Sequence, residues 1–274
     1  ELTAAEREAK PCDLVQMGFM PSQSWFAAMW GYWFGGALWD GETTITAASP
    51  ENLAAARWYR SYPERYGVKN LQAFGASFGN FASPQNPFLG EQLAMVLQGT
   101  WMYNFIEKYA PQMDWSAAPF PSADPERWPA VSIAECDVLV IPRGARHVED
   151  AFAFMRYLAE PGPAEKLALG QRKFSPLAET TPGFAAAHPN PRIGVFIALA
   201  KSPDVRVAPR LTVWKEYAEE MAVALNRLDT MKAEPEAALE EVRRRMQQKL
   251  DRLSRRWERI REQRMEEWKS HDAR

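Results

Sequence analysis

The sequence predicts a protein of the α/β class. Two observations carry this prediction: short apolar runs of strand length alternate with longer segments of helical pattern, and glycine or proline turn signals separate them. The chain has 274 residues, which allows one large domain or two modest ones. Its hydrophobic fraction of 46% is that of an ordinary globular protein, so a sizeable core can form.

The first elements follow a polar lead-in, in which one helical turn is expected at Ala4–Glu8. A short strand is expected around Leu14–Phe19, and the aromatic-rich segment Trp25–Phe34 ends at Gly35-Gly36, a breaker that lets two backbones approach closely. Asp40-Gly41 is a turn signal, and the β-branched run Thr43–Thr46 predicts a second short strand.

The next three elements have clear boundaries. Ser49-Pro50-Glu51 is typical of a helix start, with a capping Ser, Pro at the first position and Glu in the first turn, and this helix should run to about Tyr66. The apolar run Gln92–Gln98 predicts a buried strand that ends at Gly99. Thr100–Ala110 predicts a helix that opens with Trp101.

Further elements complete the alternation. Val138–Ile141 predicts another short buried strand, and Val148–Ala159 an amphipathic helix stopped by Pro161-Gly162-Pro163. Three more helices are expected at Ala164–Gly170, Arg192–Ala200 and Thr212–Asn226.

The tail from Glu236 to Lys269 has a different character, because charges crowd around regularly spaced apolar residues. These apolar positions are Leu239, Val242, Met246, Leu250, Leu253, Trp257 and Ile260. Their spacing of three and four residues predicts one amphipathic helix that lies along its own domain and then continues into solvent. A coiled-coil partner, and with it a scaffold assembled through the tail, stays an alternative.

Composition excludes several classes of function. The formal charge of −2 argues against a nucleic-acid binder, because such binding needs an excess of Lys and Arg. The charge-free aromatic stretch Trp25 to Trp39 is too short and too broken by glycine to span a bilayer. Cys12 and Cys136 lie too far apart in sequence for a CxxC pattern. We expect both to be buried free thiols, with a disulfide between them as the alternative. None of His147, His188 and His271 has a second ligand at metal-binding spacing, so neither a metal nor a cofactor is expected.

No catalytic motif is present. The sequence lacks a nucleophile elbow, a phosphate-binding loop and a dinucleotide glycine pattern. The nearest acidic candidates beside aromatic residues are Asp40 and Asp114, which we interpret as a turn residue and a loop residue. We therefore expect a protein that is not an enzyme. A glycoside-processing enzyme stays an alternative, which would need two carboxylates within about 5–10 Å of each other across a cleft.

Three tryptophans at segment ends are the candidate ligand contacts. Trp25 precedes Gly35-Gly36, Trp101 follows the bend at Gly99, and Trp214 follows Pro209. Ligands of open α/β sheets bind where strands end, and a flat indole face matches the C–H face of a pyranose ring. The alternative for each of the three is packing in the core.

At these residues the chain resembles the extracellular solute-binding proteins of bacterial sugar ABC importers, the class that includes maltose-binding protein. Six short motifs between residues 14 and 228 carry the resemblance by their order and spacing. They are Gly18-Phe19-Met20-Pro21 with Trp25 through Gly35-Gly36; Ser49-Pro50-Glu51-Asn52; Pro87-Phe88 with Gly90-Glu91; Ala94-Met95-Val96 with Gly99-Thr100-Trp101; Ala118-Pro119-Phe120-Pro121; and Val140-Ile141-Pro142-Arg143-Gly144-Ala145.

The resemblance implies a periplasmic-binding-protein-like fold of two α/β lobes. Residues 1–130 and 179–228 would form the second lobe, 131–178 part of the first lobe, and 229–274 a charged helical tail, with the first part of the N-terminal lobe lacking. It also implies that Trp25 and Trp101 match aromatics that stack on sugar, with Trp214 a looser third.

The same resemblance implies a function and a location. The expected ligand is a sugar, specifically an oligosaccharide, delivered to the membrane permease subunits of an ABC importer. The expected location is periplasmic or extracellular, with the membrane reached through the importer or through a lipid anchor. Neither an anchor nor an export signal is recognisable in these 274 residues.

Overall fold

The computed structural model describes residues 14–272, and the side chains of 266–272 are outside the description. The predicted helical turn at Ala4–Glu8 and Cys12 therefore lie outside the described residues. Internal contacts divide the chain into two compact units, each discontinuous in sequence. Within the described residues, unit 1 comprises 26–72 and 208–272, and unit 2 comprises 14–25 and 73–207. The lobe boundaries implied by the resemblance differ from this division and stay a prediction.

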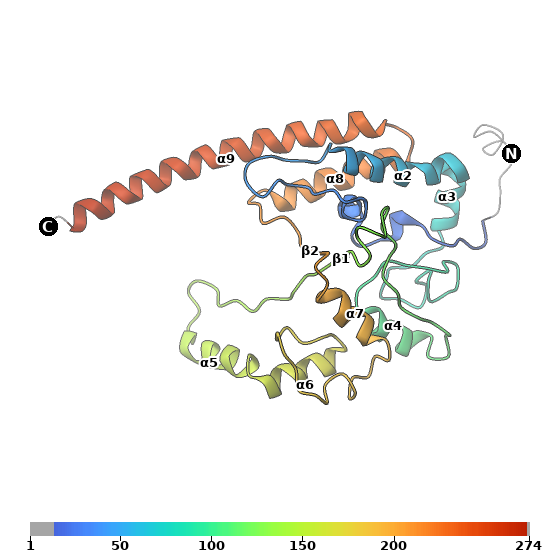
Figure 1. Cartoon of the computed structure of the whole chain (residues 1–274), viewed down its shortest axis with the longest axis horizontal. Helices are drawn as coiled ribbons and strands as arrows, with labels where there is room; N and C mark the ends of the chain where they lie inside the picture. The colour runs from blue at the N-terminus through green and yellow to red at the C-terminus, as the bar shows by residue number, and fades with distance from the viewer. Residues whose placement is uncertain (1–13, 273–274) are drawn as a thin grey trace. The chain divides into compact units, whose positions relative to one another are not determined.

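Unit 1 is built from helices. They are η2 (Ala27–Phe34), α2 (Pro50–Tyr66), the first part of α3 (Val68–Gly75), α8 (Trp214–Asp229) and α9 (Pro235–Asp272). Helices α2, α8 and α9 pack on one another, and η2 packs on α2 and α8 (Figure 1). The core between them contains fully buried Trp33, Leu38, Ile45, Tyr217 and Leu228. The Tyr217 hydroxyl donates a 2.9 Å hydrogen bond to the carbonyl of Leu38.

Helix α2 begins and ends as the sequence predicts. Ser49 Oγ accepts a hydrogen bond from the backbone N–H of Asn52, Pro50 occupies the first turn, and Gly67 ends the helix with φ of 82°. The cap also places Asn52, which is buried and donates from Nδ2 to the carbonyls of Ala37 and Thr46 at 2.8 and 2.7 Å.

The close approach expected beside Gly35-Gly36 is present. A Cβ built on Gly36 would lie 2.7 Å from Oδ1 of Asn52, and a Cβ on Gly31 would overlap the same oxygen. Gly35 itself adopts the left-handed conformation with φ of 80°. Glycine is required at Gly31 and Gly36 because the side-chain amide of Asn52 on α2 occupies the space that a side chain would need.

The tail forms one helix, α9, as predicted. Leu239, Val242, Met246 and Leu250 are buried against unit 1, and Leu253 is partly buried. Gln247 ties the helix to the segment before α2. Its Oε1 accepts from the N–H of Ile45 at 2.8 Å, and its Nε2 donates to the carbonyl of Thr43 at 2.9 Å.

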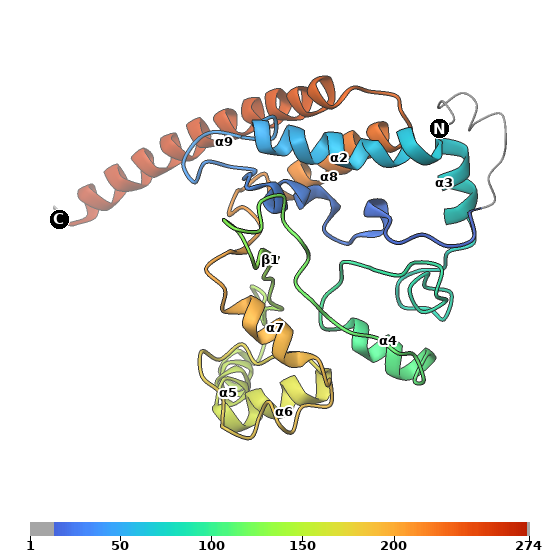
Figure 2. The same ribbon diagram turned by 45° about the vertical axis from the view of Figure 1, so that its right-hand side comes forward.

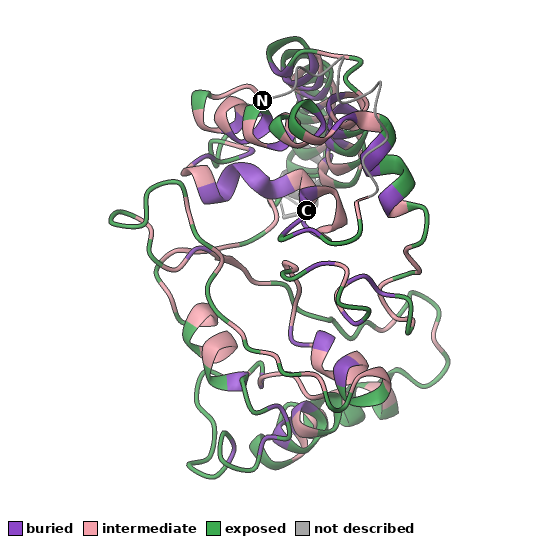
Figure 3. Cartoon of the chain, turned by 90° about the vertical axis from the view of Figure 1, so that its right-hand side faces the viewer, coloured by how far each residue is buried: buried purple, intermediate pink, exposed green. Residues whose placement is uncertain are grey.

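Unit 2 combines shorter helices with a small sheet. Its elements are η1 (Pro21–Gln23), α4 (Met102–Tyr109), β1 (Ser132–Ile133), α5 (Val148–Leu158), α6 (Pro161–Gln171), α7 (Ile193–Ala200) and β2 (Val205–Arg206). Strands β1 and β2 are parallel, with Ser132 opposite Val205 and Ile133 opposite Arg206. Helix α7 packs on β1, and α5 on α6 (Figure 2). The long connecting segments of unit 2 are mostly exposed or partly buried (Figure 3), although Leu89, Leu93 and Val131 within them are buried.

The helices were predicted better than the strands. Pro161 begins α6 where the sequence predicted only a stop, because proline is accepted in a first helical turn. The predicted strands Leu14–Phe19 and Gln92–Gln98 meet only in a parallel bridge between Met17 and Leu93. Thr43–Thr46 contributes only the bridge from Ile45 to Trp39.

The prediction for Val138–Ile141 is wrong for this structure. The segment forms no strand, and Val138 and Val140 are 73% and 75% exposed. An apolar run becomes a buried strand only where another strand and a covering layer receive it, and no described segment does so here. Cys136, expected to be buried, is exposed.

Candidate functional site

Two of the three predicted tryptophans lie together in unit 2. The ring centroids of Trp25 and Trp101 are 6.4 Å apart, and their planes are inclined at 65°. Trp25 also meets Phe81 edge to face at 5.0 Å, and Phe81 meets Phe105 of α4 at 5.5 Å. These four rings, named here the aromatic cluster, join residues 25, 81 and 101–105 although they are far apart in sequence.

Trp101 is held in place by its local backbone. It precedes α4 with αR angles, and its carbonyl accepts the N–H of Asn104 at 3.0 Å. Its indole Nε1 donates to Oε1 of Gln98 at 3.1 Å. The ring folds back over Gly99, where a Cβ would lie 2.6 Å from ring atom Cε3 and closer still to two further ring carbons. Gly99 therefore provides the space that the indole occupies, and the ring is left partly buried.

Trp25 is the most exposed member of the aromatic cluster. Its side chain is 58% exposed, although Phe81 and Trp101 both contact it. A large apolar ring that two other rings contact and that is still more than half exposed is typical of a ligand contact.

Sequence reasoning missed Phe81 and Phe105. Phe105 follows Trp101 by four residues, and such residues share one face of a helix, so this neighbour could have been found. Phe81 lies in the turn that Gly79 and Gln85 close through a 2.9 Å backbone hydrogen bond. Nothing in the local sequence indicated that this turn would reach Trp25.

The third predicted tryptophan has different surroundings. Trp214 begins α8 in unit 1, is partly buried, and contacts the core residue Tyr217 edge to face at 5.9 Å. Trp30 and Trp33 of η2 are both buried.

Polar contacts fix α4 to the end of α6. Arg172 donates from Nη1 to Oδ1 of Asn104 at 3.0 Å and forms an ion pair with Glu107. Its guanidinium carbon also lies 5.9 Å from the ring centroid of Tyr103. Arg172 adopts a left-handed backbone at the C-terminal end of α6. Its guanidinium there contacts α4, the helix that carries Phe105.

The carboxylates that the sequence singled out lack the properties of a catalytic acid. The backbone N–H groups of Thr44, Glu42 and Thr43 donate to Oδ1 of Asp40 and lower its pKa to about 2, whereas a general acid needs a raised pKa. Asp40 is thus the turn residue that was predicted. Asp114 is exposed.

Residues 14–272, as far as they are described, offer neither a metal-binding cluster nor a membrane-spanning helix. No group of three or more His, Cys, Asp or Glu side chains there could hold a metal ion. No helix in that range combines the length and apolar character needed to cross a bilayer. Of the described histidines, His188 has a structural role, since its Nδ1 accepts the N–H of Asn190 and its Nε2 lies 3.1 Å from the carbonyl of Lys173.

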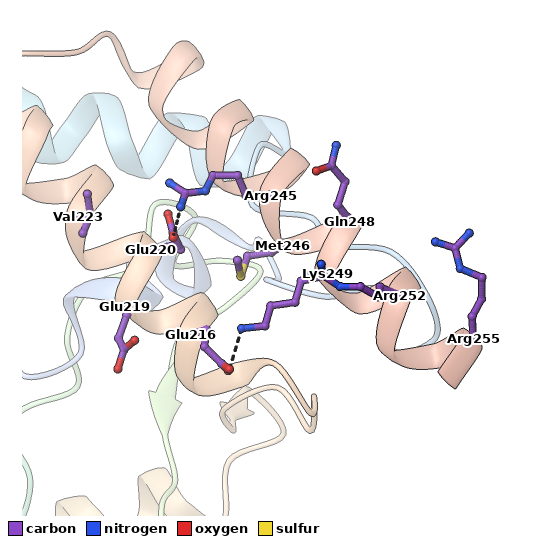
Figure 4. Close-up of a pocket in the computed structure, with 10 residues that line it drawn as sticks. All are labelled: Glu216, Glu219, Glu220, Val223, Arg245, Met246, Gln248, Lys249, Arg252 and Arg255. Carbon is purple, nitrogen blue, oxygen red and sulfur yellow. Dashed lines mark hydrogen bonds and ion pairs between the residues drawn. The ribbon is translucent and has the colours of Figure 1, made fainter. Parts of the chain in front are cut away.

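An open groove in unit 1 lies between α8 and α9 (Figure 4). Its lining is mostly charged: Glu216, Glu219, Glu220, Val223, Arg245, Met246, Gln248, Lys249, Arg252 and Arg255. Two ion pairs cross it, Glu216 with Lys249 at 2.8 Å and Glu220 with Arg245 at 2.9 Å. None of the three predicted tryptophans lines it, so its chemistry differs from that of the aromatic cluster.

Comparison with known proteins identifies similar sequences and folds. Residues 2–185 match the family model described as bacterial extracellular solute-binding protein. The Brucella abortus (strain 2308) protein BAB2_0491, named as a binding protein, is 23% identical over 217 residues, which are 79% of this chain and 50% of that protein. The chain therefore spans about half the length of the curated relatives it matches.

Solved structures show the fold. CpMnBP1 with mannobiose bound is 22% identical with a TM-score of 0.71, over 88% of this chain and 63% of that one. The sugar-binding protein MalE from Xanthomonas citri is 19% identical with a TM-score of 0.64, over 92% of this chain and 61% of that one. These likenesses confirm the predicted fold class, the α/β fold of two-lobe binding proteins.

Proposed function

Because the chain belongs to the family of bacterial extracellular solute-binding proteins, we propose that it binds an oligosaccharide and presents it to an ABC importer. The observation that carries the proposal is the aromatic cluster, in which exposed Trp25 stands beside Trp101. The fold neighbours are consistent with this ligand class, since CpMnBP1 is known with mannobiose and with mannotriose bound.

The geometry suits a pyranose chain. Two indole planes inclined at 65° form a corner, so one ring can contact the C–H face of a sugar while the other contacts its edge or the next residue. Each stacked aromatic would contribute about 1 kcal/mol beyond the area that it buries. The edge contact from Phe81 holds Trp25 in place before ligand arrives, which lowers the entropy cost of binding.

The test is calorimetric titration of the chain with mannobiose and mannotriose, with mannose and glucose as monosaccharide references. We expect saturable binding of an oligosaccharide that weakens in Trp25→Ala and in Trp101→Ala. Trp257→Ala is the matched control, because that tryptophan is equally exposed but lies on α9. Equal affinity in all three variants would remove the aromatic cluster from the site.

Binding without turnover is the second part of the proposal. The lowered pKa of Asp40 supports it, as does the family, whose members bind solutes. After long incubation of the protein with each sugar, chromatography should return the sugar unchanged. Cleaved or transferred products at enzymatic rates would instead favour a glycoside-processing enzyme.

Trp214 of unit 1 is proposed as a further sugar contact. Its ring is only partly buried, which leaves part of its surface for a sugar. Trp214→Ala should weaken oligosaccharide binding and leave the urea midpoint nearly unchanged. A fall in midpoint with unchanged affinity would assign the ring to the packing around Tyr217.

Family membership indicates a periplasmic or extracellular location. We propose the membrane subunits of an importer as the partner there. Sugar-dependent stimulation of transport ATPase activity in vesicles that hold the candidate permease would support this. ATPase activity that sugar stimulates equally with and without the chain would contradict this proposal.

The lobe assignment is also a proposal. Residues 131–178 would belong to the first lobe and need further apolar structure to cover them. Helix α5 has no buried residue, Phe152 and Phe154 are exposed, and Val138 and Val140 are exposed before them. Serine at these four positions should reduce hydrophobic-dye binding and self-association of the chain with little change in its urea midpoint. A large fall in the midpoint would show that they already serve a core.

A further inference from the structure

The C-terminal part of α9 has different surroundings from the rest of that helix. Leu239, Val242, Met246 and Leu250 are buried in unit 1, whereas none of the described side chains after Leu250 is buried. Trp257 is 57% exposed. Figures 1 and 2 both show α9 continuing past α2 and α8. The segment 252–265 is therefore helix without a packing partner in the described part of unit 1.

The apolar stripe of α9 continues along this segment. Leu253, Trp257 and Ile260 follow Leu250 at steps of three, four and three residues, so they lie on the side of the helix that is buried earlier. An apolar stripe that outruns its partner helix indicates a second binding surface.

The charges change at the same point. Before it, Arg245 and Lys249 of α9 pair with Glu220 and Glu216 of α8, and Arg243 pairs with Glu240 of α9 itself. After it, residues 252–264 carry a net charge of +4, from six arginines and two glutamates. The arginines are Arg252, Arg255, Arg256, Arg259, Arg261 and Arg264. No ion pair joins any of them to a side chain that the structure describes.

These two properties together select the occupant. A second copy of the segment would supply an apolar stripe but would bring two charges of +4 together, which is unfavourable. An anionic lipid surface offers negative charge at the headgroups and apolar matter just below them. Arginines with a tryptophan at the boundary are the residues that such a surface binds.

We propose that residues 252–265 of α9 bind the surface of an anionic phospholipid bilayer. The helix lies parallel to the surface, the arginines contact the headgroups, and Trp257 and Ile260 enter the interfacial layer. The chain as a whole has a net charge of −2, so this attraction is local to the segment. The surface would hold the protein near the membrane independently of its sugar ligand and of an importer.

The test is sedimentation of the full chain with vesicles of equal phosphatidylglycerol and phosphatidylcholine, and with vesicles of phosphatidylcholine alone. We expect binding to the anionic vesicles, and release when salt is raised from about 0.05 to 0.5 M because the Debye length shrinks. Each basic residue near such a surface contributes about fivefold to binding. The variant Arg255→Gln, Arg256→Gln, Arg259→Gln should therefore bind about 100-fold more weakly.

A matched control separates the segment from net charge. Arg65→Gln, Arg143→Gln, Arg146→Gln removes the same charge at exposed positions outside α9 and should bind like the unaltered chain. Circular dichroism checks that both triple variants keep their helix content. The single variant Trp257→Ala should also weaken vesicle binding, without changing its salt dependence.

Several results would overturn the proposal. These are equal binding to both kinds of vesicle, equal binding by the two triple variants, and retention on a polyglutamate peptide without vesicle binding, which would identify an acidic protein partner. Light scattering without lipid tests the second copy. A dimer that disappears in Trp257→Ala would show self-association through the stripe instead.

Discussion

Replacing Gly99 with alanine tests whether the placement of Trp101 matters apart from its presence. The added Cβ would lie 2.6 Å from Cε3 of the ring and closer to two other ring carbons, whereas carbon contacts are stable at about 3.5–4.0 Å. The indole must therefore move by about 1 Å or more. Such a displacement opens the corner with Trp25, and the stacking lost there is about 1–2 kcal/mol. Oligosaccharide affinity should fall about five- to thirtyfold.

The assay is calorimetric titration with mannotriose beside urea unfolding. Gly90→Ala is the control, because its Cβ would make only an ordinary contact at 3.5 Å with the carbonyl oxygen of Asn86. Trp101→Ala sets the upper limit, with an expected affinity loss of about 1–3 kcal/mol. Its stability loss should stay below the roughly 3–5 kcal/mol of a fully buried Trp, because this ring is only partly buried. Unchanged affinity in both variants with a collapsed urea midpoint would refute the reasoning and assign Trp101 to the core.

Four other outcomes are expected from the structure. Tyr217→Phe should lower stability by about 1–1.5 kcal/mol in urea unfolding, since the carbonyl of Leu38 loses its buried donor, and no loss would mean that water replaces it. Asp40→Asn should lower the urea midpoint at pH 7, because the folded-state pKa of Asp40 lies below its unfolded value. The difference in midpoint between variant and unaltered chain should fade between about pH 4 and pH 2, where Asp40 becomes protonated. A difference that is constant with pH would contradict the charge argument. Asp229→Asn should raise the thermal midpoint at neutral pH, because burial raises the pKa of the Asp229 carboxyl at the end of α8, so its charged form destabilises the fold. The gain should vanish in acid, where the carboxyl of the unaltered chain is protonated. A lower midpoint in the variant would reveal a missed partner of Asp229. Deleting residues 255–274 should leave mannotriose affinity unchanged in calorimetry, and a large loss would place the tail beside the sugar site.

The helices could be predicted because their signals are local. Ser49-Pro50 supplies a cap and a fixed first turn for α2, and the three-four spacing of α9 spans seven apolar positions. Gln92–Gln98 has no such signal. A short apolar run has no periodicity of its own, and whether it forms a strand depends on a partner elsewhere in the chain. Here only Leu93 finds one, at Met17.

The candidate site divides in the same way. The motif ending at Trp101 pointed to that residue, and the glycine before it explains the ring position once the structure is known. That Trp25 would lie beside it depends on a turn at Phe81 with no sequence signal. Trp214, which the resemblance gave as a looser third contact, belongs to unit 1, whereas the other two belong to unit 2.

The discontinuity of unit 1 has a consequence for how the chain folds as it is made. Residues 26–72 must wait for α8 and α9, because Leu38 pairs with Tyr217 and Ile45 with Gln247, 179 and 202 residues later. At about 5–20 residues per second, the intervening residues 73–207 delay this closure by on the order of ten seconds. Such long-range closure also slows refolding, because loop entropy is lost before the contacts form. Throughout that interval α2 can pack on η2 but lacks α8 and α9, so a chaperone that acts during synthesis would meet the part of α2 that these two helices later cover.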